Sequence, residues 1–150
     1  MRQLRAYSIF ALKDRLNVNK VIIYSDGAAR GNPGPAAIGA TIKDEKGNLI
    51  ATISRRIGST TNNQAEYRAV IAALEQAISL GATHVALRSD SELVVKQLRG
   101  QYRVKNKALM PLYQRVKQLT GSLESFAIAH VPREQNVEAD SLTNLALDTK

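Results

Sequence analysis

Four acidic residues occupy places in the chain where they could act together on a phosphate ester. Asp26 ends the apolar run KVIIYSD, and Asp90 ends the similar run HVALRSD. Glu66 lies near the start of a long helical pattern, and Asp140 lies in EQNVEADSLTN close to the C-terminus. Clustered carboxylates suit a hard cation such as Mg²⁺, which prefers oxygen ligands and keeps water and phosphate oxygens in its shell. Two such ions can support in-line displacement at phosphorus without a nucleophilic side chain.

Each aspartate also has an ordinary structural explanation. Asp26 precedes a loop rich in glycine and proline, where an acid could shape the turn. Asp90 could cap a helix that begins at Ser91. Taken singly, these explanations are as good as a metal site, but the same Ser-Asp ending on two strands favours the site. In open α/β sheets ligands bind beyond the carboxyl ends of the strands, so the two acids would meet there if their strands are parallel neighbours.

Glu66 gives a stronger indication because of its place on the predicted helix. It lies in one row with Val70, Ala73 and Ala77, at the spacing of a single helical face. A carboxylate on the face that packs on a sheet costs on the order of a few kcal/mol unless it is protonated or paired, and a cation would remove that cost. The alternative is that Glu66 favours the helix dipole and reaches water. Asp140 carries no such pattern, since an acid early in a helix is common.

The elements that would position these acids alternate between strand and helix patterns. A helix from Asn62 to Leu80 would end at Gly81 as its C-cap, and Pro132 would stop the last strand. The order of the elements predicts an α/β fold, with a five-stranded mixed sheet flanked by helices. The predicted strands are 20–25, 37–43, 49–57, 84–90 and 125–132, and the predicted helices are 62–80, 91–100, 108–119 and 134–148.

Length and composition indicate one globular domain. The 150 residues, 44% of them hydrophobic, are enough for a single core. We assign residues 19–150 to this domain and 1–18 to an N-terminal extension, whose apolar patch YSIFAL is too short for a signal peptide. Cysteine is absent, which excludes disulfides and thiolate metal sites and suits a reducing compartment. No apolar run is long enough to span a bilayer, so we expect a cytoplasmic protein without a membrane partner.

The net charge of +8 indicates either a polyanionic partner or simple solubility. Neutralisation of phosphates by Lys and Arg would make binding to a nucleic acid salt-dependent. The chain has no Trp and only 5% aromatic residues, which disfavours base stacking and the aromatic platforms of a sugar site. If nucleic acid is the partner, its backbone and shape should matter more than its stacked bases.

Four blocks of the sequence together match a known family. They are YSDGAARGNPGPAAIG, TNNQAEYRAVIAAL, LRSDSELVVKQL and HVPREQNVEADSLTNLA. Their order and spacing over residues 20–147 resemble type 1 ribonuclease H. The resemblance implies a sheet of three antiparallel strands and two further parallel strands. It also implies cleavage of the RNA strand of an RNA–DNA hybrid by two Mg²⁺ or Mn²⁺ ions, leaving 5′-phosphate and 3′-hydroxyl ends.

The resemblance further implies roles for individual residues. Asp26 corresponds to the central metal ligand, with Glu66 and Asp90 beside it, and Asp140 corresponds to the carboxylate that serves the second ion. Thr61 corresponds to a family residue that contacts a phosphate of the DNA strand. Asn32, Asn62 and Asn63 correspond to family residues that contact the minor groove of the hybrid. Amides and hydroxyls can read 2′-hydroxyls, and the same residue types are natural in turns and helix caps.

The chain departs from the family pattern near the last strand. Many relatives carry a histidine in a flexible loop before the fourth acid, whereas the loop here is PREQN. Arg133 or Glu134 would then act near the scissile phosphate, and His130 is interpreted as structural. A basic protrusion of some relatives is also absent, so hybrid binding would depend on the residues of QYRVKNK that carry positive charge: Arg103, Lys105 and Lys107.

Two other functions stay open at this point. One is a non-catalytic nucleic-acid-binding module on the same fold, although a binder has no need of four acids where phosphate must lie. The other is a relative that also cleaves double-stranded RNA, which the sequence does not decide. We expect a complete protein rather than the ribonuclease H portion of a polymerase, and we expect a monomer.

Overall fold

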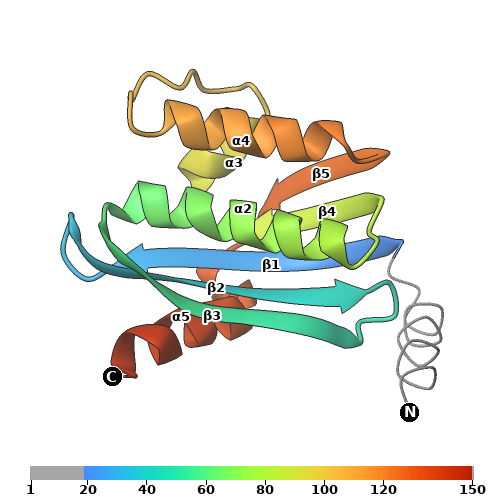
Figure 1. The fold of residues 1–150 in the computed structure, drawn as a ribbon, viewed down its shortest axis with the longest axis horizontal. Helices are drawn as coiled ribbons and strands as arrows, with labels where there is room; N and C mark the ends of the chain where they lie inside the picture. Colours follow the sequence, from blue (N-terminus) through green and yellow to red (C-terminus); the bar gives the residue numbers. More distant parts are fainter. Residues whose placement is uncertain (1–18, 150) are drawn as a thin grey trace, which may run out of the picture.

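The computed structural model describes residues 19–149, so the predicted extension 1–18 lies outside the described residues. The described chain forms one five-stranded sheet covered by helices (Figure 1). The strands are β1 (Lys20–Ala29), β2 (Gly34–Asp44), β3 (Leu49–Thr60), β4 (His84–Ser89) and β5 (Ser125–His130). The helices are α2 (Asn62–Ser79), α3 (Glu92–Leu98), α4 (Met110–Gly121) and α5 (Val137–Asp148), with a 3₁₀ turn η1 (Arg133–Gln135) before α5.

The sheet combines an antiparallel half with a parallel half. Its strand order is β3-β2-β1-β4-β5. β2 runs antiparallel to both β1 and β3, whereas β4 runs parallel to both β1 and β5. The predicted α/β fold, with three antiparallel strands and two further parallel strands, is confirmed. The β1–β4 pairing ends with Ser25 opposite Ser89, so Asp26 and Asp90 each come one residue after the same pair.

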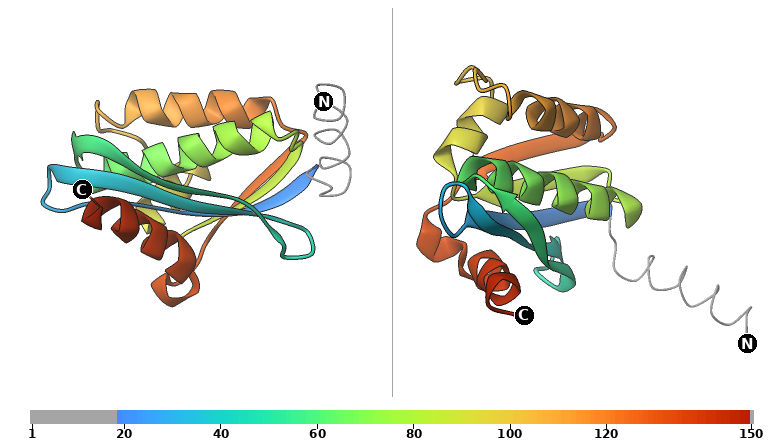
Figure 2. Two further views of the ribbon diagram at one scale, coloured as in Figure 1. Left: turned by 60° about the horizontal axis from the view of Figure 1, so that its bottom comes forward. Right: turned by 60° about the vertical axis from the view of Figure 1, so that its left-hand side comes forward.

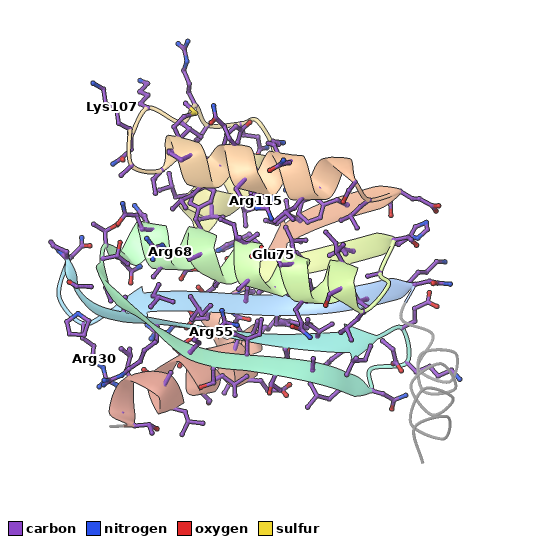
Figure 3. All side chains as sticks on the ribbon, in the orientation of Figure 1. Arg30, Arg55, Arg68, Glu75, Lys107 and Arg115 are labelled. Carbon is purple, nitrogen blue, oxygen red and sulfur yellow. The ribbon has the colours of Figure 1, made fainter. Side chains whose placement is uncertain are left out.

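The helices form layers on the two faces of this sheet. α2 packs on β1 and β2 with α4 beside it, and α5 packs on the opposite face over β2 and β3 (Figure 2). The main core lies on the α2 side, where Ile23, Tyr67 and Leu74 are fully buried. On the surface of this layer, Arg115 of α4 lies 3.1 Å from Glu75 of α2 (Figure 3). Within residues 19–149, no helix is long and apolar enough to cross a bilayer.

Both ends of α2 follow from local chemistry. Thr61 is the N-cap, and its hydroxyl accepts a hydrogen bond from the Gln64 backbone N–H at 3.2 Å. The Gln64 side chain accepts in return from the Thr61 N–H, which completes a capping box. At the other end Gly81 has φ +98°, a conformation that glycine adopts without steric cost. The capping box holds the first turn in a defined position, and Glu66 follows directly after that turn.

Two predicted boundaries are wrong in ways that concern the acids. β1 continues to Ala29, so Asp26 lies inside the strand rather than at its end, because pairing with β2 continues opposite Gly39. The closing helix predicted at 134–148 begins only at Val137, because Asn136 has the non-helical angles φ −117° and ψ 27°. The last strand also ends earlier than predicted, at His130. Apart from the end of β1, every predicted end lies within three residues of the observed one.

Candidate active site

Two aspartates meet where the parallel strands β1 and β4 separate. Asp26 follows the last β1–β4 pair on β1, and Asp90 follows it on β4. The N-cap of α3 is Ser91, whose hydroxyl accepts from the Val94 N–H at 3.3 Å. The capping role that could have explained Asp90 is therefore performed by its neighbour, and the Asp90 carboxylate is left to face Asp26.

Glu66 reaches the same place from the first turns of α2. The helix lies against β1 because Gly27 has no side chain: a Cβ at this position would lie 2.2 Å from the Ala65 carbonyl oxygen. Carboxylate oxygens of Asp26, Glu66 and Asp90 consequently lie within 4.8 Å of one another. The alternative in which Glu66 reaches water is wrong, because this residue is only 4% exposed.

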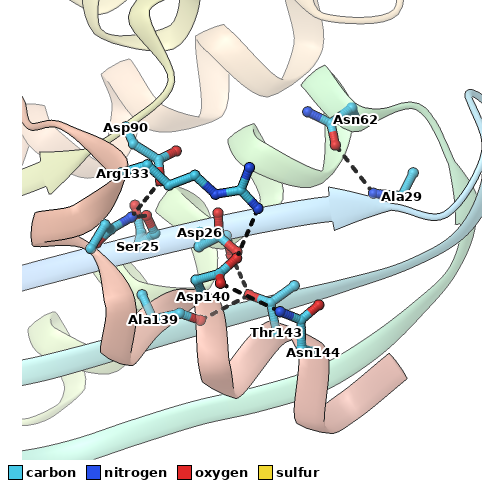
Figure 4. Close-up of polar contacts among 11 residues, drawn as sticks. Ser25, Asp26, Ala29, Asn62, Asp90, Arg133, Ala139, Asp140, Thr143 and Asn144 are labelled. Carbon is cyan, nitrogen blue, oxygen red and sulfur yellow. Dashed lines mark hydrogen bonds and ion pairs between the residues drawn. The ribbon is translucent and has the colours of Figure 1, made fainter. Parts of the chain in front are cut away.

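Asp140 joins the three acids from the first turn of α5. One of its oxygens lies 3.6 Å from Nη2 of Arg133, and the other accepts from the Asn144 side chain at 3.4 Å (Figure 4). All four acids line one open pocket of about 380 Å³, together with Arg133 and Glu134. The four predicted acids are thus brought to one pocket, but Asp140 stands outside the tight group of three.

Burial makes this pocket electrostatically unfavourable for free carboxylates. Burial, with smaller contributions from the charges of Asp90 and Asp140, raises the pKa of Asp26 from 3.8 to about 6. Burial, and then the charges of Asp26 and Asp90, also raises the pKa of Glu66 well above its ordinary value. Like charges in a desolvated site favour protonation or a bound cation. The fold therefore holds these acids in an arrangement that is costly without a positively charged partner.

The chemistry of the donor set fits a divalent cation. Within the described chain, Asp26 Oδ2 and Glu66 Oε2 are buried and have no hydrogen-bond partner. A buried carboxylate oxygen without a partner is costly, and a hard cation supplies what the oxygen lacks. Asp26, Glu66 and Asp90 are the residues that would hold such an ion. Asp140 is close enough to raise the pKa of Asp26 by its charge, so it could share a second ion.

The four residues predicted to contact a hybrid lie around the N-terminus of α2. The Asn32 side-chain oxygen accepts from the Asn62 backbone N–H at 3.1 Å, and the Asn62 side-chain oxygen accepts from the Ala29 N–H at 3.3 Å. The second of these bonds is drawn in Figure 4. Asn32, Thr61 and Asn63 line a polar hollow of about 210 Å³. The structural and binding interpretations of these residues are compatible, because both bonds use only the amide oxygens.

Three residues near these sites were missed or misinterpreted from the sequence. Asn106 lines the hollow beside Thr61, and its only signal was its place within the basic segment QYRVKNK. His130 was interpreted as structural, but it is exposed and lines the carboxylate pocket. Asn136 is buried beside Asp90. The loop before α4 carries three exposed basic side chains: Arg103, Lys105 and Lys107. Figure 3 shows Lys107 projecting from this loop.

Comparisons with known proteins agree with this geometry. A family model described as reverse transcriptase-like matches residues 24–146. The ribonuclease HI of Halobacterium salinarum is 46% identical over 129 residues, which cover 86% of this chain. The chain belongs to the type 1 ribonuclease H family. The bifunctional protein Rv2228c of Mycobacterium tuberculosis is a further relative, 43% identical over 130 residues, or 86% of this chain.

Solved ribonuclease H structures have the same fold. The RNase H1 of H. salinarum superposes with a TM-score of 0.84 at 46% identity, over 86% of this chain and 98% of that one. LC11-RNase H1, solved in complex with an RNA/DNA hybrid, superposes with a TM-score of 0.82 at 45% identity, over 85% of this chain and 96% of that one. The chain spans 65% of the full length of the H. salinarum ribonuclease HI and 36% of Rv2228c.

The raised pKa values predict how the stability of this ribonuclease H family member depends on pH. The folded state binds the Asp26 proton more tightly than the unfolded state, so the free energy of unfolding falls as pH rises from about 4 to about 6. With a shift from 3.8 to about 6, Asp26 alone should cost about 3 kcal/mol at pH 7. Glu66 shifts in the same direction and extends the loss to higher pH.

Urea unfolding from pH 4.5 to pH 8, with chelator or with Mg²⁺, measures this effect. We expect the metal-free protein to be more stable near pH 5 than at pH 8, and Mg²⁺ to stabilise it more at pH 8. The variant Asp26→Asn should flatten the metal-free profile. A metal-free stability that rises steadily through this range in the unsubstituted protein would contradict the prediction.

Proposed function

We propose that this protein is an endoribonuclease that hydrolyses the RNA strand of RNA–DNA hybrids. The observation that carries the proposal is the group of three carboxylates within 4.8 Å at the separation of β1 and β4, with Asp140 on the rim. We propose Mg²⁺ as the natural cation, with Mn²⁺ as a substitute, two ions in catalysis, and 5′-phosphate and 3′-hydroxyl products. We also propose that residues 19–150 are the catalytic domain and that it acts as a cytoplasmic monomer.

The chain's own residues would divide the work in this pocket. Asp26, Glu66 and Asp90 would bind and orient one ion, and Asp140 together with Asp26 would hold the other. When bound, such ions activate water and stabilise the leaving oxygen of an in-line displacement at phosphorus. Arg133, 3.6 Å from Asp140 and otherwise exposed, would reach the scissile phosphate from the rim. Glu134 lines the same pocket and is the second accessory candidate.

The residues around the N-terminus of α2 would select the hybrid. An RNA-specific contact needs a donor or acceptor at a 2′-hydroxyl, and the Asn32, Asn62 and Asn63 amides have suitable chemistry. Thr61 would contact a phosphate of the DNA strand. The relative LC11-RNase H1 was solved with an RNA/DNA hybrid, and its similarity supports the same class of substrate here. Arg103, Lys105 and Lys107, in the exposed loop before α4, would attract the phosphates of the hybrid. This attraction would weaken as the salt concentration rises.

Asn63→Ala is expected to weaken binding of the hybrid more than it slows the chemical step. Asn63 is exposed on the first turn of α2 and lines the polar hollow. Loss of one hydrogen bond worth about 1 kcal/mol should raise KM roughly five- to tenfold, with kcat changed less than twofold. Steady-state cleavage of a labelled hybrid measures both constants. Gln76→Ala, an exposed amide farther along the same helix, should change neither, and an equal rise in KM for the two variants would contradict the role.

A panel of labelled duplexes tests the proposed function itself. RNA–DNA, RNA–RNA and DNA–DNA duplexes of one sequence are incubated with Mg²⁺, with Mn²⁺ or with chelator. Cleavage of the RNA strand of the hybrid, dependent on metal, is the expected result. Cutting of the RNA–RNA duplex as well would extend the substrate range to double-stranded RNA. Binding of the hybrid without cleavage in either metal would reject the enzyme in favour of a non-catalytic nucleic-acid-binding module.

A further inference from the structure

One buried side chain touches the carboxylate group without belonging to it. Asn136 lies at the bend between η1 and α5 and is only 1% exposed. Its Nδ2 donates to the backbone carbonyl of Ser25 at 2.8 Å and to Asp90 Oδ2 at 3.3 Å. Ser25 directly precedes Asp26 on β1, so a single amide joins the backbone beside Asp26 to the Asp90 carboxylate.

The backbone of the same residue extends this link to the fourth acid. The Asn136 carbonyl accepts from the Asp140 N–H at 3.1 Å, which is the first backbone bond of α5. Asn136 therefore contacts three separate elements: β1, the end of β4 and α5. Each of these elements carries one acid of the pocket. We propose that Asn136 is a positioning residue, which holds Asp26, Asp90 and Asp140 in register for the cations of the proposed function.

The choice of an amide is explained by what surrounds it. Asp26, which is buried, and Asp90, which is half-buried, approach each other as negatively charged groups, so they tend to separate unless something holds them. The Asn136 amide supplies two N–H donors from one nitrogen and cannot ionise at any pH. An aspartate of the same shape would lack both donors, and a serine would be shorter and offer a single O–H. The amide oxygen itself is buried and has no hydrogen-bond partner in the described chain, so the nitrogen carries the function of the side chain.

A purely structural role is the competing explanation, and the chain offers a matched control for it. Gln97 is also a buried amide, 4% exposed, and its oxygen accepts from the Tyr67 hydroxyl at 2.6 Å. It contacts Tyr67 in the core rather than any acid of the pocket. If buried amides matter here only for stability, substitutions at Asn136 and Gln97 should have the same consequences. If Asn136 positions the acids, only its substitution should change the affinity for metal.

The experiment compares Asn136→Leu and Asn136→Ala with Gln97→Leu in the full chain. Leucine keeps the branching and the number of side-chain heavy atoms of asparagine and removes both donors, whereas alanine removes the bulk as well. The dissociation constant for Mn²⁺ is measured by calorimetry without substrate, and the melting temperature of each variant is recorded in chelator. Residues that support metal ligands in this way typically contribute 10- to 100-fold in affinity. We expect a rise in Kd of about that size for both Asn136 variants and a change of less than twofold for Gln97→Leu.

Each other outcome overturns the inference. If Asn136→Leu and Asn136→Ala melt at lower temperature but bind Mn²⁺ like the unsubstituted protein, the residue is structural. If neither variant folds while Gln97→Leu does, Asn136 serves the fold and not the site. These outcomes leave the proposed function intact, because the unsubstituted protein still binds metal and cleaves the hybrid. An unsubstituted protein that neither binds Mn²⁺ nor cleaves would reject the proposed function and this inference together.

Discussion

Asp26→Asn is expected to abolish cleavage of an RNA–DNA hybrid and, at the same time, to make the metal-free protein more stable at neutral pH. The Asp26 carboxylate belongs to the group of three whose oxygens lie within 4.8 Å of one another, and in the proposed function it is the ligand that both ions share. Metal ions stabilise the charge of a transition state by several kcal/mol, so loss of their central ligand should reduce kcat about 10³-fold or more. The amide also removes a buried charge that costs about 3 kcal/mol at pH 7, as its pKa near 6 implies.

Activity and unfolding measurements on the same preparation test both halves of this prediction. Asp44→Asn is the matched control. Asp44 accepts from the backbone N–H groups of Lys46 and Asn48, each at 2.9 Å. Burial acts to raise the pKa of Asp44, but the hydrogen bonds from Asn48 and Lys46 together hold it below its ordinary value. Its substitution should lower stability and leave kcat unchanged. An Asp26→Asn variant that still cleaves within tenfold of the unsubstituted rate would refute the central role of this residue.

Gly27→Ala is expected to be the most disruptive substitution of a single methyl group. An added Cβ would lie 2.2 Å from the Ala65 carbonyl oxygen and 2.6 Å from the Glu66 backbone nitrogen. These atoms belong to the backbone of α2 and cannot rotate away, so the helix must move from β1. Overpacking of this kind costs about 3 kcal/mol or more. The movement would also carry Glu66 away from Asp26, so cleavage should fall together with stability.

Thermal unfolding and hybrid cleavage of Gly27→Ala, with and without Mg²⁺, provide the measurement. Gly121→Ala is the control, because Gly121 is the last residue of α4 and a Cβ there meets no atom within 4 Å. Alanine is the better helix former, so this control should keep or slightly increase stability. Normal stability and activity of Gly27→Ala would show that α2 does not need its close contact with β1.

Most of the fold was predictable because its determinants are local. Alternating apolar residues on strands and the helical row Glu66, Val70, Ala73, Ala77 identify each element by its own period. The errors occur where a distant segment decides. β1 extends past its apolar run because β2 supplies partners as far as Ala36 opposite Ala29. The last helix starts late because the side chain of Asn136 bonds to Ser25, 111 positions earlier in the chain.

The acids themselves were visible in the sequence because they follow recognisable patterns: Asp26 and Asp90 end similar apolar runs, and Glu66 lies on an apolar helical face. The sequence by itself therefore determined the family, the type of fold and the residues able to bind a cation. Only the tertiary structure decided which of these acids meet, how deeply they are buried and what holds them. These properties depend on the pairing of Ser25 with Ser89 and on the close approach of α2 at Gly27. A carboxylate acquires a raised pKa, and an asparagine acquires a positioning role, only from neighbours that are distant along the chain.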